Sequence, residues 1–223
     1  MIDVKDLQVA IEHNLAALKR SVRNLRKFQK GEKLTYPKAF MDHPIVHLRD
    51  EDVVSAKVFA SRSSLLASLS LPKNSFCCEV GTSTGAFAKE ILAAFDPEEL
   101  HVIDIDFSRF DEGLRQNIAV SKHLGDSTKI LSGFSDNYFD FIYVDADHGY
   151  DSVVSELKVI RRKIKPGAIV MFNDYTNWSL NEVQPYGVVA AVNQFVRDTN
   201  AKVIGVALSG TAHHDVALRM PAA

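Results

Sequence analysis

The chain of 223 residues is predicted to be an α/β protein, with a doubly wound, mostly parallel sheet after an N-terminal helical segment. From about residue 75 onward, short apolar runs alternate with segments whose apolar residues recur every three or four positions. The first of these runs ends in a glycine-rich turn that contains Gly81 and Gly85. The last two runs are separated by about eight residues, too few for a helical crossover, so they are expected to pair antiparallel.

The overall composition is that of an ordinary globular chain, because 46% of the residues are hydrophobic and 24% are charged. A net charge of −2 gives no argument for nucleic acid or a membrane surface as a partner. No apolar run approaches the ~20 residues that a membrane-spanning helix needs. The first six residues lack the charged-then-apolar order of a secretion signal, so a cytoplasmic location is expected.

Residues 1–50 are expected to form a helical cap or dimerisation segment, and residues 51–223 the main domain. Apolar residues recur at helical spacing along one face of a predicted long helix: Val4, Leu7, Ile11, Leu15, Leu18, Val22 and Leu25. Basic residues gather toward its end, before Gly31: Arg20, Arg23, Arg26, Lys27 and Lys30. The simplest interpretation is a solvated basic face near a helix C-terminus. The alternatives are a handle for an anionic substrate and a homodimer contact through this helix.

Seven short apolar runs are predicted to be strands, at 76–80, 101–105, 128–131, 139–144, 168–172, 203–207 and 216–220. Alternation with helices implies right-handed crossovers and a parallel sheet covered on both faces. Together with the final hairpin, this is a Rossmann-like, doubly wound seven-stranded sheet with a terminal antiparallel hairpin. The adjacent cysteines Cys77 and Cys78 fit two small buried hydrophobes in the first strand.

Helices are predicted before the first strand and between the strands. They cover 51–69, 86–95, a segment through Phe110, Leu114 and Ile118, a segment from Val153 to the stop at Pro166-Gly167, and a segment through Val188, Val192 and Phe195. In a doubly wound sheet, ligands bind where the carboxyl ends of the strands meet. Polar residues directly after each predicted strand are therefore the candidate ligand contacts.

The first strand runs into the loop Glu79-Val80-Gly81-Thr82-Ser83-Thr84-Gly85. Its glycines allow a close approach of backbone to a ligand, and the next helix offers free N–H groups. Ser83 stands where a dinucleotide-binding fingerprint has its second glycine, which disfavours NAD. A zwitterionic amino-acid tail fits better, with Glu79 for its ammonium group and Thr82 and Ser83 beside it.

The second strand ends at Asp104, about 20 residues beyond the loop, where an acid can accept both hydroxyls of a ribose. Asp106 suits a helix cap better. The turn at Gly125, Asp126 and Ser127 could bind adenine through the Asp126 side chain and nearby amides. A plain turn would show the same residues.

The fourth and fifth strands end in Asp145-Ala146-Asp147-His148 and in Asn173-Asp174. Asp145, Asn173 and Asp174 offer hard oxygen donors that suit Mg²⁺ or a similar divalent ion. Chance clustering of polar residues at strand ends is the alternative. His213 and His214, in the final hairpin, are expected to be ordinary turn histidines. Tyr175 and Trp178 either wall an acceptor pocket or pack against the fold.

These motifs, together with Tyr150 and Lys165-Pro166-Gly167, resemble those of class I S-adenosylmethionine-dependent methyltransferases over about residues 50–220. The chain looks most like the metal-dependent O-methyltransferases of the catechol, caffeoyl-CoA and antibiotic-sugar types. The resemblance implies Asp145, Asn173 and Asp174 as metal ligands, in a different order from the Asp-Asn or Asp-Asp of many relatives. His148 stands where the catechol and caffeoyl-CoA types have a catalytic lysine.

The resemblance implies a magnesium-binding transferase that methylates a small hydroxylated acceptor, catechol-like or a vicinal diol. Gly81, Gly85, Asp104, Asp126, Ser127, Asp145 and Asp147 then contact S-adenosylmethionine, besides Glu79, Thr82 and Ser83. His148 is either the general base, helped by Asp147, or a supporting residue. Three alternatives stay open: a metal-independent methyltransferase acting on another nucleophile, a non-catalytic S-adenosylmethionine-binding protein and, less favoured, an NAD-dependent dehydrogenase.

Overall fold

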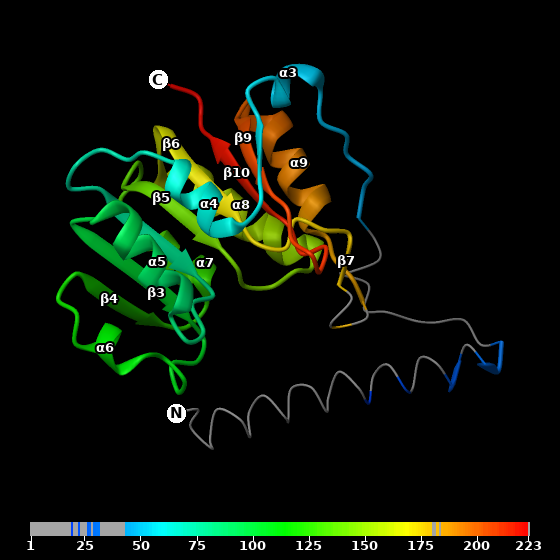
Figure 1. Ribbon diagram of the computed structural model, residues 1–223, viewed down its shortest axis with the longest axis horizontal. Coiled ribbons are helices and arrows are strands. Elements are labelled where there is room, and N and C mark those ends of the chain that lie inside the picture. The colour runs from blue at the N-terminus through cyan, green and yellow to red at the C-terminus, as the bar shows by residue number, and fades with distance from the viewer. Residues whose placement is uncertain are drawn as a thin grey trace.

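The computed structural model describes residues 43–179, 182 and 184–222, with a few isolated positions between 19 and 31. Most of the predicted N-terminal cap, its basic face and its homodimer contact lie outside the described residues. The described part is an α/β/α sandwich, in which helices cover both faces of one twisted sheet (Figure 1). Among the described residues, no helix combines the length and the apolar composition needed to cross a bilayer.

Eight described strands form the sheet in the order β1-β9-β10-β6-β5-β2-β3-β4. They are β1 (Lys57–Phe59), β2 (Phe76–Val80), β3 (Glu99–Asp104), β4 (Val120–Leu124), β5 (Phe139–Val144), β6 (Ile164–Phe172), β9 (Lys202–Ala207) and β10 (Asp215–Arg219). β10 runs antiparallel to both β6 and β9, which confirms the predicted hairpin, and the other pairs are parallel. The carboxyl ends of β2 to β6 therefore meet at one edge of the sheet.

Two apolar cores hold the helices to the sheet. One lies against α7 (Ser127–Ser132), α8 (Tyr150–Lys163) and α9 (Val188–Thr199). The other lies against α4 (Arg62–Ser68), α5 (Ala86–Phe95) and α6 (Glu112–Arg115). Because β5 is buried on both faces, all six of its residues are buried, and both cysteines of β2 are free and buried as predicted.

The prediction of a single helix over 51–69, and with it the count of seven strands, is wrong. The segment divides into α3 (Asp50–Val53), the short strand β1 and α4. β1 is an edge strand of three residues that pairs with β9, and Val58 at its centre is 71% exposed. Such a strand has no alternating apolar pattern in its sequence, so it is recognised only in the structure, where it pairs with β9.

The predicted strand at 128–131 is also wrong, because these residues lie in α7. Asp126 is the N-cap of that helix and accepts a hydrogen bond from the backbone N–H of Lys129 at 2.9 Å. The strand next to β3 is β4, whose sequence is half polar because it lies at the other sheet edge. The helix expected through Ile118 is only the four-residue α6, and Ile118 is fully exposed.

Candidate active site at the carboxyl edge of the sheet

The two loop glycines are required by contacts within the protein. Gly81 has φ +82°, and a Cβ there would lie 1.8 Å from the carbonyl oxygen of Asp145. Gly85, the N-cap of α5, has φ +81°, and its Cβ would lie 2.4 Å from Leu114. The loop therefore packs directly against the end of β5, which joins the predicted cofactor loop to the predicted metal site.

Asp104 lies at the end of β3 with its carboxylate fixed by two backbone amides. Ser83 N–H donates to Oδ2 at 2.7 Å, and Asp106 N–H donates to Oδ1 at 2.9 Å. Each oxygen keeps a lone pair that can accept a hydrogen bond from a hydroxyl group, as the predicted binding of ribose requires. Asp106 instead accepts from Ser108 N–H, and the N-cap of α6 is Asp111, so the prediction of Asp106 as a helix cap is wrong.

Two exposed apolar residues flank this carboxylate. Ile105, directly after Asp104, is 80% exposed, and Leu124, at the end of β4, is 71% exposed. An apolar surface beside a ribose-binding acid suits the face of a planar base. Ile105 closes a predicted strand, whereas Leu124 lies in β4, which the sequence did not predict.

Asp126 and Ser127, predicted at adenine, are both engaged inside the protein. Asp126 caps α7, while Ser127 Oγ donates to Glu156 Oε1 at 2.5 Å. Glu156 is buried, and burial raises its pKa to about 7. Any contact of Asp126 or Ser127 with adenine would therefore add to these hydrogen bonds.

Glu79 is the buried acid beneath the loop, with 2% of its surface exposed. Thr82 Oγ1 donates to its Oε2 at 2.5 Å. Burial raises the pKa of Glu79 to about 8, and the charges of Asp145 and Asp104 act in the same direction. A cation bound beside Glu79 would favour its ionised form.

The raised pKa of Glu79 predicts that the ligand-free protein loses stability as the pH rises from 7 to 9. In this window the folded state holds a proton that the unfolded state, with an ordinary glutamate, has released, so the stability falls through the folded pKa. Each unit of pKa shift corresponds to ~1.4 kcal/mol. Thermal denaturation across this range should show a fall of several degrees, and Glu79→Gln should reduce the slope.

Two histidines have the opposite effect on stability, but they titrate below this pH range. Burial lowers the pKa of His101 and of His123, so these histidines affect stability only below their usual value near 6.5, where stability rises with pH. Glu156 and Asp215, whose pKa values burial raises to about 7, act in the same direction as Glu79. A melting temperature that stays level or rises between pH 7 and 9 would contradict the assignment.

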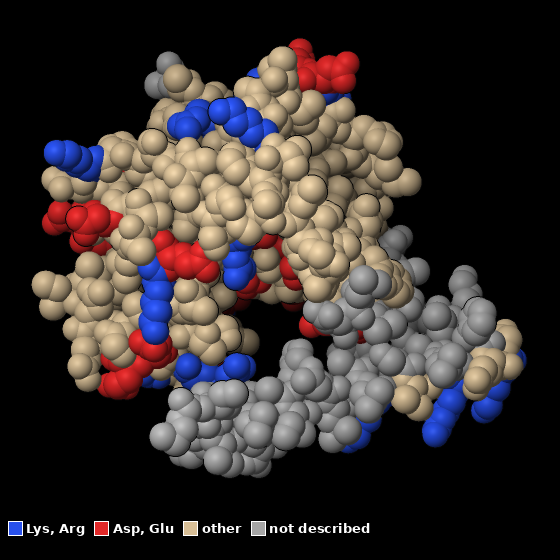
Figure 2. Space-filling view, viewed as in Figure 1, with Lys and Arg blue, Asp and Glu red and all other residues tan. Residues whose placement is uncertain are grey.

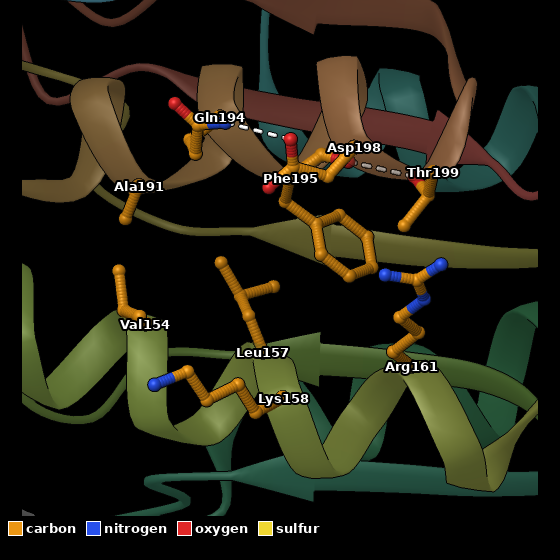
Figure 3. Close-up of a pocket in the computed structure, with 9 residues that line it drawn as sticks. All are labelled: Val154, Leu157, Lys158, Arg161, Ala191, Gln194, Phe195, Asp198 and Thr199. Atoms are coloured by element: carbon orange, nitrogen blue, oxygen red, sulfur yellow. Dashed lines mark hydrogen bonds between the residues drawn. The ribbon is translucent and has the colours of Figure 1, made fainter.

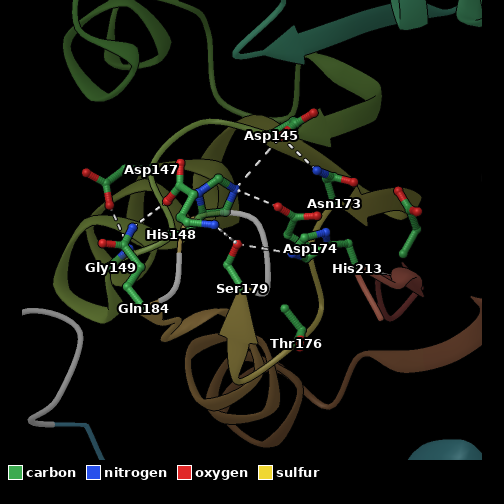
Figure 4. A network of polar contacts seen from close by, with 12 residues as sticks. Asp145, Asp147, His148, Gly149, Asn173, Asp174, Thr176, Ser179, Gln184 and His213 are labelled. Atoms are coloured by element: carbon green, nitrogen blue, oxygen red, sulfur yellow. Dashed lines mark hydrogen bonds and ion pairs between the residues drawn. The ribbon is translucent and has the colours of Figure 1, made fainter. Parts of the chain in front are cut away.

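The ends of β5 and β6 bring together three predicted ligands and His148 (Figure 4). Asn173 Nδ2 donates to Asp145 Oδ1 at 2.9 Å. His148 Nε2 lies 3.2 Å from Asp174 Oδ2 and 3.9 Å from Asp145 Oδ1. Asp174 has φ +52°, a left-handed conformation that costs energy in a residue with a side chain. Acidic side chains also gather around a hollow on this side of the molecule (Figure 2).

His148 lies between the carboxylates of Asp174 and Asp145. Burial lowers its pKa, but the charges of Asp174 and Asp145 outweigh this and raise the pKa above its usual value. Its ring stacks on Tyr186 with the centroids 4.2 Å apart. Nε2 is fully buried and makes no aligned hydrogen bond to any described residue, so it faces the site as an unsatisfied polar atom.

Two other predicted residues of this edge, Asp147 and Tyr175, make hydrogen bonds within the fold. Asp147 is exposed and accepts a hydrogen bond from Gly149 N–H at 2.6 Å at the start of α8, rather than contacting the His148 ring. Tyr175 donates to Asn193 on α9 at 2.6 Å, so it packs against the fold.

A small hairpin of β7 (Trp178–Ser179) and β8 (Gln184–Pro185) lies next to His148, and Tyr186 follows it. Ser179 Oγ lies 3.2 Å from His213 Nε2, and the ring centroids of Tyr186 and His213 are 6.3 Å apart. His213 thus borders the site, although the sequence predicted an ordinary turn histidine. Its 34-residue separation from Ser179 hides this contact from sequence reasoning.

The residues at this edge match a divalent ion in chemical type, since they offer two carboxylates, an amide and the unsatisfied imidazole nitrogen. They are not arranged around a common point. In the described part of the chain, no group of three or more His, Cys, Asp or Glu side chains is positioned to hold a metal ion. The side chains therefore suit a divalent ion by the type of their donor atoms, but not by their arrangement in the ligand-free protein.

A pocket of about 110 Å³ lies elsewhere, between α8 and α9 (Figure 3). Its floor is apolar, with Leu157 and Phe195, and Gln194 Nε2 donates to Asp198 Oδ1 at 2.7 Å on its rim. None of the predicted site residues lines it. The candidate site is thus the carboxyl edge of the sheet.

Comparison with known families supports this location. A family model described as a methyltransferase domain matches residues 78–175, which run from β2 to the residue after Asp174. Residues 78–175 are a methyltransferase domain. The matched segment contains the glycine loop, Asp104, Asp126, His148 and all three predicted metal ligands. The match and the fold agree with a methyltransferase, and they define neither the acceptor nor a metal requirement.

Solved structures share the fold at low sequence identity. The N-methyltransferase NodS from Bradyrhizobium japonicum, in complex with S-adenosyl-L-homocysteine, is 18% identical with a TM-score of 0.55, over 72% of this chain and 86% of that one. A SAM-dependent methyltransferase from Aquifex aeolicus is 17% identical with a TM-score of 0.53, over 72% and 90%. An O-methyltransferase family protein from Burkholderia thailandensis is 12% identical with a TM-score of 0.54, over 72% and 55%.

These likenesses establish the methyltransferase fold of this chain and no more. The matched structures include both an N- and an O-methyltransferase, so the fold does not determine the acceptor atom. No curated protein matches the chain. The acceptor has to be argued from the residues of the site.

Proposed function

We propose that this methyltransferase transfers the methyl group of S-adenosylmethionine to a hydroxyl oxygen of a small acceptor, catechol-like or a vicinal diol, with a divalent cation assisting. One observation carries the proposal. His148 Nε2 is buried and unsatisfied between Asp145 and Asp174, directly beside the loop that would hold the cofactor. An acceptor hydroxyl placed there would meet a proton acceptor and two carboxylates.

The cofactor would lie across the ends of β2 and β3. Glu79 would bind the ammonium group of the amino-acid tail, and Asp104 would accept the ribose hydroxyls. Ile105 and Leu124 would cover the adenine, with Asp126 and Ser127 near its edge. This arrangement is supported by the two amides that orient Asp104 and by the exposure of both apolar side chains.

Asp145, Asn173 and Asp174 would hold the divalent ion. When bound, such an ion stabilises the negative charge that develops on an acceptor oxygen. A vicinal diol would offer it two oxygens. The amide of Asn173 donates to Asp145 in the ligand-free protein, so its oxygen would have to turn toward the ion.

The chain itself would supply orientation and a proton acceptor. Stacking on Tyr186 fixes the plane of the His148 ring, and Asp174 stabilises its positive form. The neutral form of His148 would accept the proton of the acceptor hydroxyl as the hydroxyl oxygen attacks the methyl group in line. Asp147 would orient the turn before α8 through Gly149 rather than receive the proton.

A metal-independent transfer is the second candidate, and a specific contact favours it. His148 already lies between the two carboxylates that would otherwise repel each other, and its protonated form would stabilise them without an ion. In this case Asp174 and His148 act as a dyad and the acceptor needs one acidic hydroxyl. A diol would have no advantage.

Chelation separates the two candidates. We expect that exhaustive removal of divalent ions, and Asp145→Ala, each abolish methyl transfer to a catechol or diol, because the developing charge loses its counter-ion. Binding of S-adenosylhomocysteine, measured by calorimetry, should remain within a few-fold of wild type. Added Mg²⁺ or Mn²⁺ should restore the chelated wild type but not the variant.

Full activity in chelator would refute metal assistance and leave the dyad. Binding of S-adenosylhomocysteine with no transfer to catechols, acyl-CoA esters or sugars would favour a cofactor-binding protein without methyltransferase activity. Binding of NAD in place of S-adenosylhomocysteine would overturn the cofactor assignment. An exposed acid far from the site, such as Glu51, gives a matched control as Glu51→Ala.

A further inference from the structure

Arg62 is a cation at the candidate cofactor site that lies outside every sequence motif discussed above. It is the first residue of α4, whose N-cap Ser61 accepts a hydrogen bond from Ser64 N–H at 3.1 Å. The guanidinium carbon lies 4.6 Å from the ring centroid of Phe87, two residues after Gly85. Nη1 donates to Tyr143 Oη at 3.0 Å, two residues before Asp145. The guanidinium is thus held between the first turn of α5, which follows the glycine loop, and β5.

The surroundings of Arg62 are acidic. Tyr143 Oη donates onward to Asp215 Oδ1 at 3.1 Å, and Asp215 is buried at the start of β10. The positive charge of Arg62 acts on Glu79, Asp145 and Asp215 alike, lowering the pKa of each against the effect of burial. Without this cation, the pocket would repel any anionic group of a ligand.

The amino-acid tail of the proposed cofactor carries such a group. Its ammonium and carboxylate are bonded to the same carbon, so the carboxylate must lie within a few ångströms of the acid that binds the ammonium. A guanidinium has five N–H donors in a planar fork that matches a carboxylate. The contacts with Tyr143 and Phe87 use one N–H and one face of Arg62.

We propose that Arg62 binds the α-carboxylate of S-adenosylmethionine, opposite Glu79 at the ammonium group. Tyr143 and Phe87 are positioning residues that hold the guanidinium for this contact. This inference rests on the proposed function, because it assigns a residue to the same cofactor.

Two ligands that differ only in the carboxylate test the assignment. S-adenosylmethionine and decarboxylated S-adenosylmethionine are titrated calorimetrically against the full-length wild type and Arg62→Gln. We expect wild type to prefer the carboxylated ligand by roughly 10- to 100-fold, the usual range for a charge-assisted hydrogen-bonded pair. In Arg62→Gln the preference should collapse to about one, because only the carboxylated ligand loses a contact.

Matched variants separate binding from folding. Arg62→Lys keeps the charge without the planar fork, so it should retain part of the preference. Tyr143→Phe removes only the hydroxyl that orients Arg62, and should reduce the preference severalfold even if Arg62→Gln does not fold. Lys89→Gln removes an exposed cation of α5 that pairs with Asp111, and should leave the preference unchanged.

The outcomes are distinct. A wild type that binds both ligands equally overturns the role of Arg62, as does an Arg62→Gln variant that weakens both ligands by the same factor. Arg62→Gln that melts earlier yet keeps the wild-type preference shows a structural role and also overturns it. A wild type that binds neither ligand refutes the proposed cofactor instead.

Discussion

Replacing His148 by alanine should lower the turnover number by 10²–10⁴-fold, the usual contribution of a positioned general base. Nε2 of the imidazole is buried and unsatisfied between Asp145 and Asp174, where the neutral ring would accept the hydroxyl proton. The Kd for S-adenosylhomocysteine should change little, because Glu79 and Asp104, which would bind the ammonium group and the ribose, lie at β2 and β3. Single-turnover rates and calorimetry measure the two quantities separately.

The pH dependence gives a second test of the same residue. Because neighbouring carboxylates raise the pKa of His148, the fraction of neutral base, and with it the wild-type rate, should increase with pH through a value above 6.5. This limb should be absent from His148→Asn. Tyr186→Phe keeps the stacking ring and serves as the control. A His148→Ala enzyme with near-wild-type turnover would show that His148 only supports the site.

Gly81→Ala should destabilise the protein by about 3 kcal/mol or more and eliminate cofactor binding. A left-handed backbone costs a residue with a Cβ roughly 1–2 kcal/mol, and overpacking adds roughly 1–3 kcal/mol. The new Cβ would lie 1.8 Å from the Asp145 carbonyl oxygen, so the loop and the end of β5 must separate. Chemical denaturation and S-adenosylhomocysteine titration measure both effects.

Gly167→Ala is the matched control for this substitution. Gly167 has φ +73°, close to that of Gly81, but a Cβ there meets no atom within 4 Å. It should therefore show the backbone cost alone, about 1–2 kcal/mol, with cofactor binding intact. Equal losses in the two variants would mean that the contact between Gly81 and Asp145 is unimportant for the loop.

Local patterns were sufficient for the elements in the centre of the fold. β2, α5 and β5 have the predicted bounds, because a buried strand or an amphipathic helix carries its burial in its own apolar spacing. The terminal hairpin was predicted from the length of its connecting loop alone, since about eight residues are too few for a helical crossover. The edge strands β1 and β4 escaped prediction because half-exposed strands lack that spacing.

The candidate site shows the same division. Strand ends located Asp104, Asp145, Asn173 and Asp174, since the carboxyl ends of parallel strands must meet at one edge of a sheet. Arg62, Glu156, Tyr186 and His213 reach this edge from elsewhere in the chain, and no local spacing marks them.

The sequence alone thus determined the doubly wound sheet, the cofactor loop and the acids at the strand ends. Only the tertiary structure showed that Gly81 packs on Asp145, that His148 lies between two carboxylates, and that Arg62 contacts Tyr143 and Phe87. The reason is physical. The apolar spacing of neighbouring residues is enough to predict which side chains are buried. The charge and protonation of a side chain depend instead on which distant residues folding brings within a few ångströms of it.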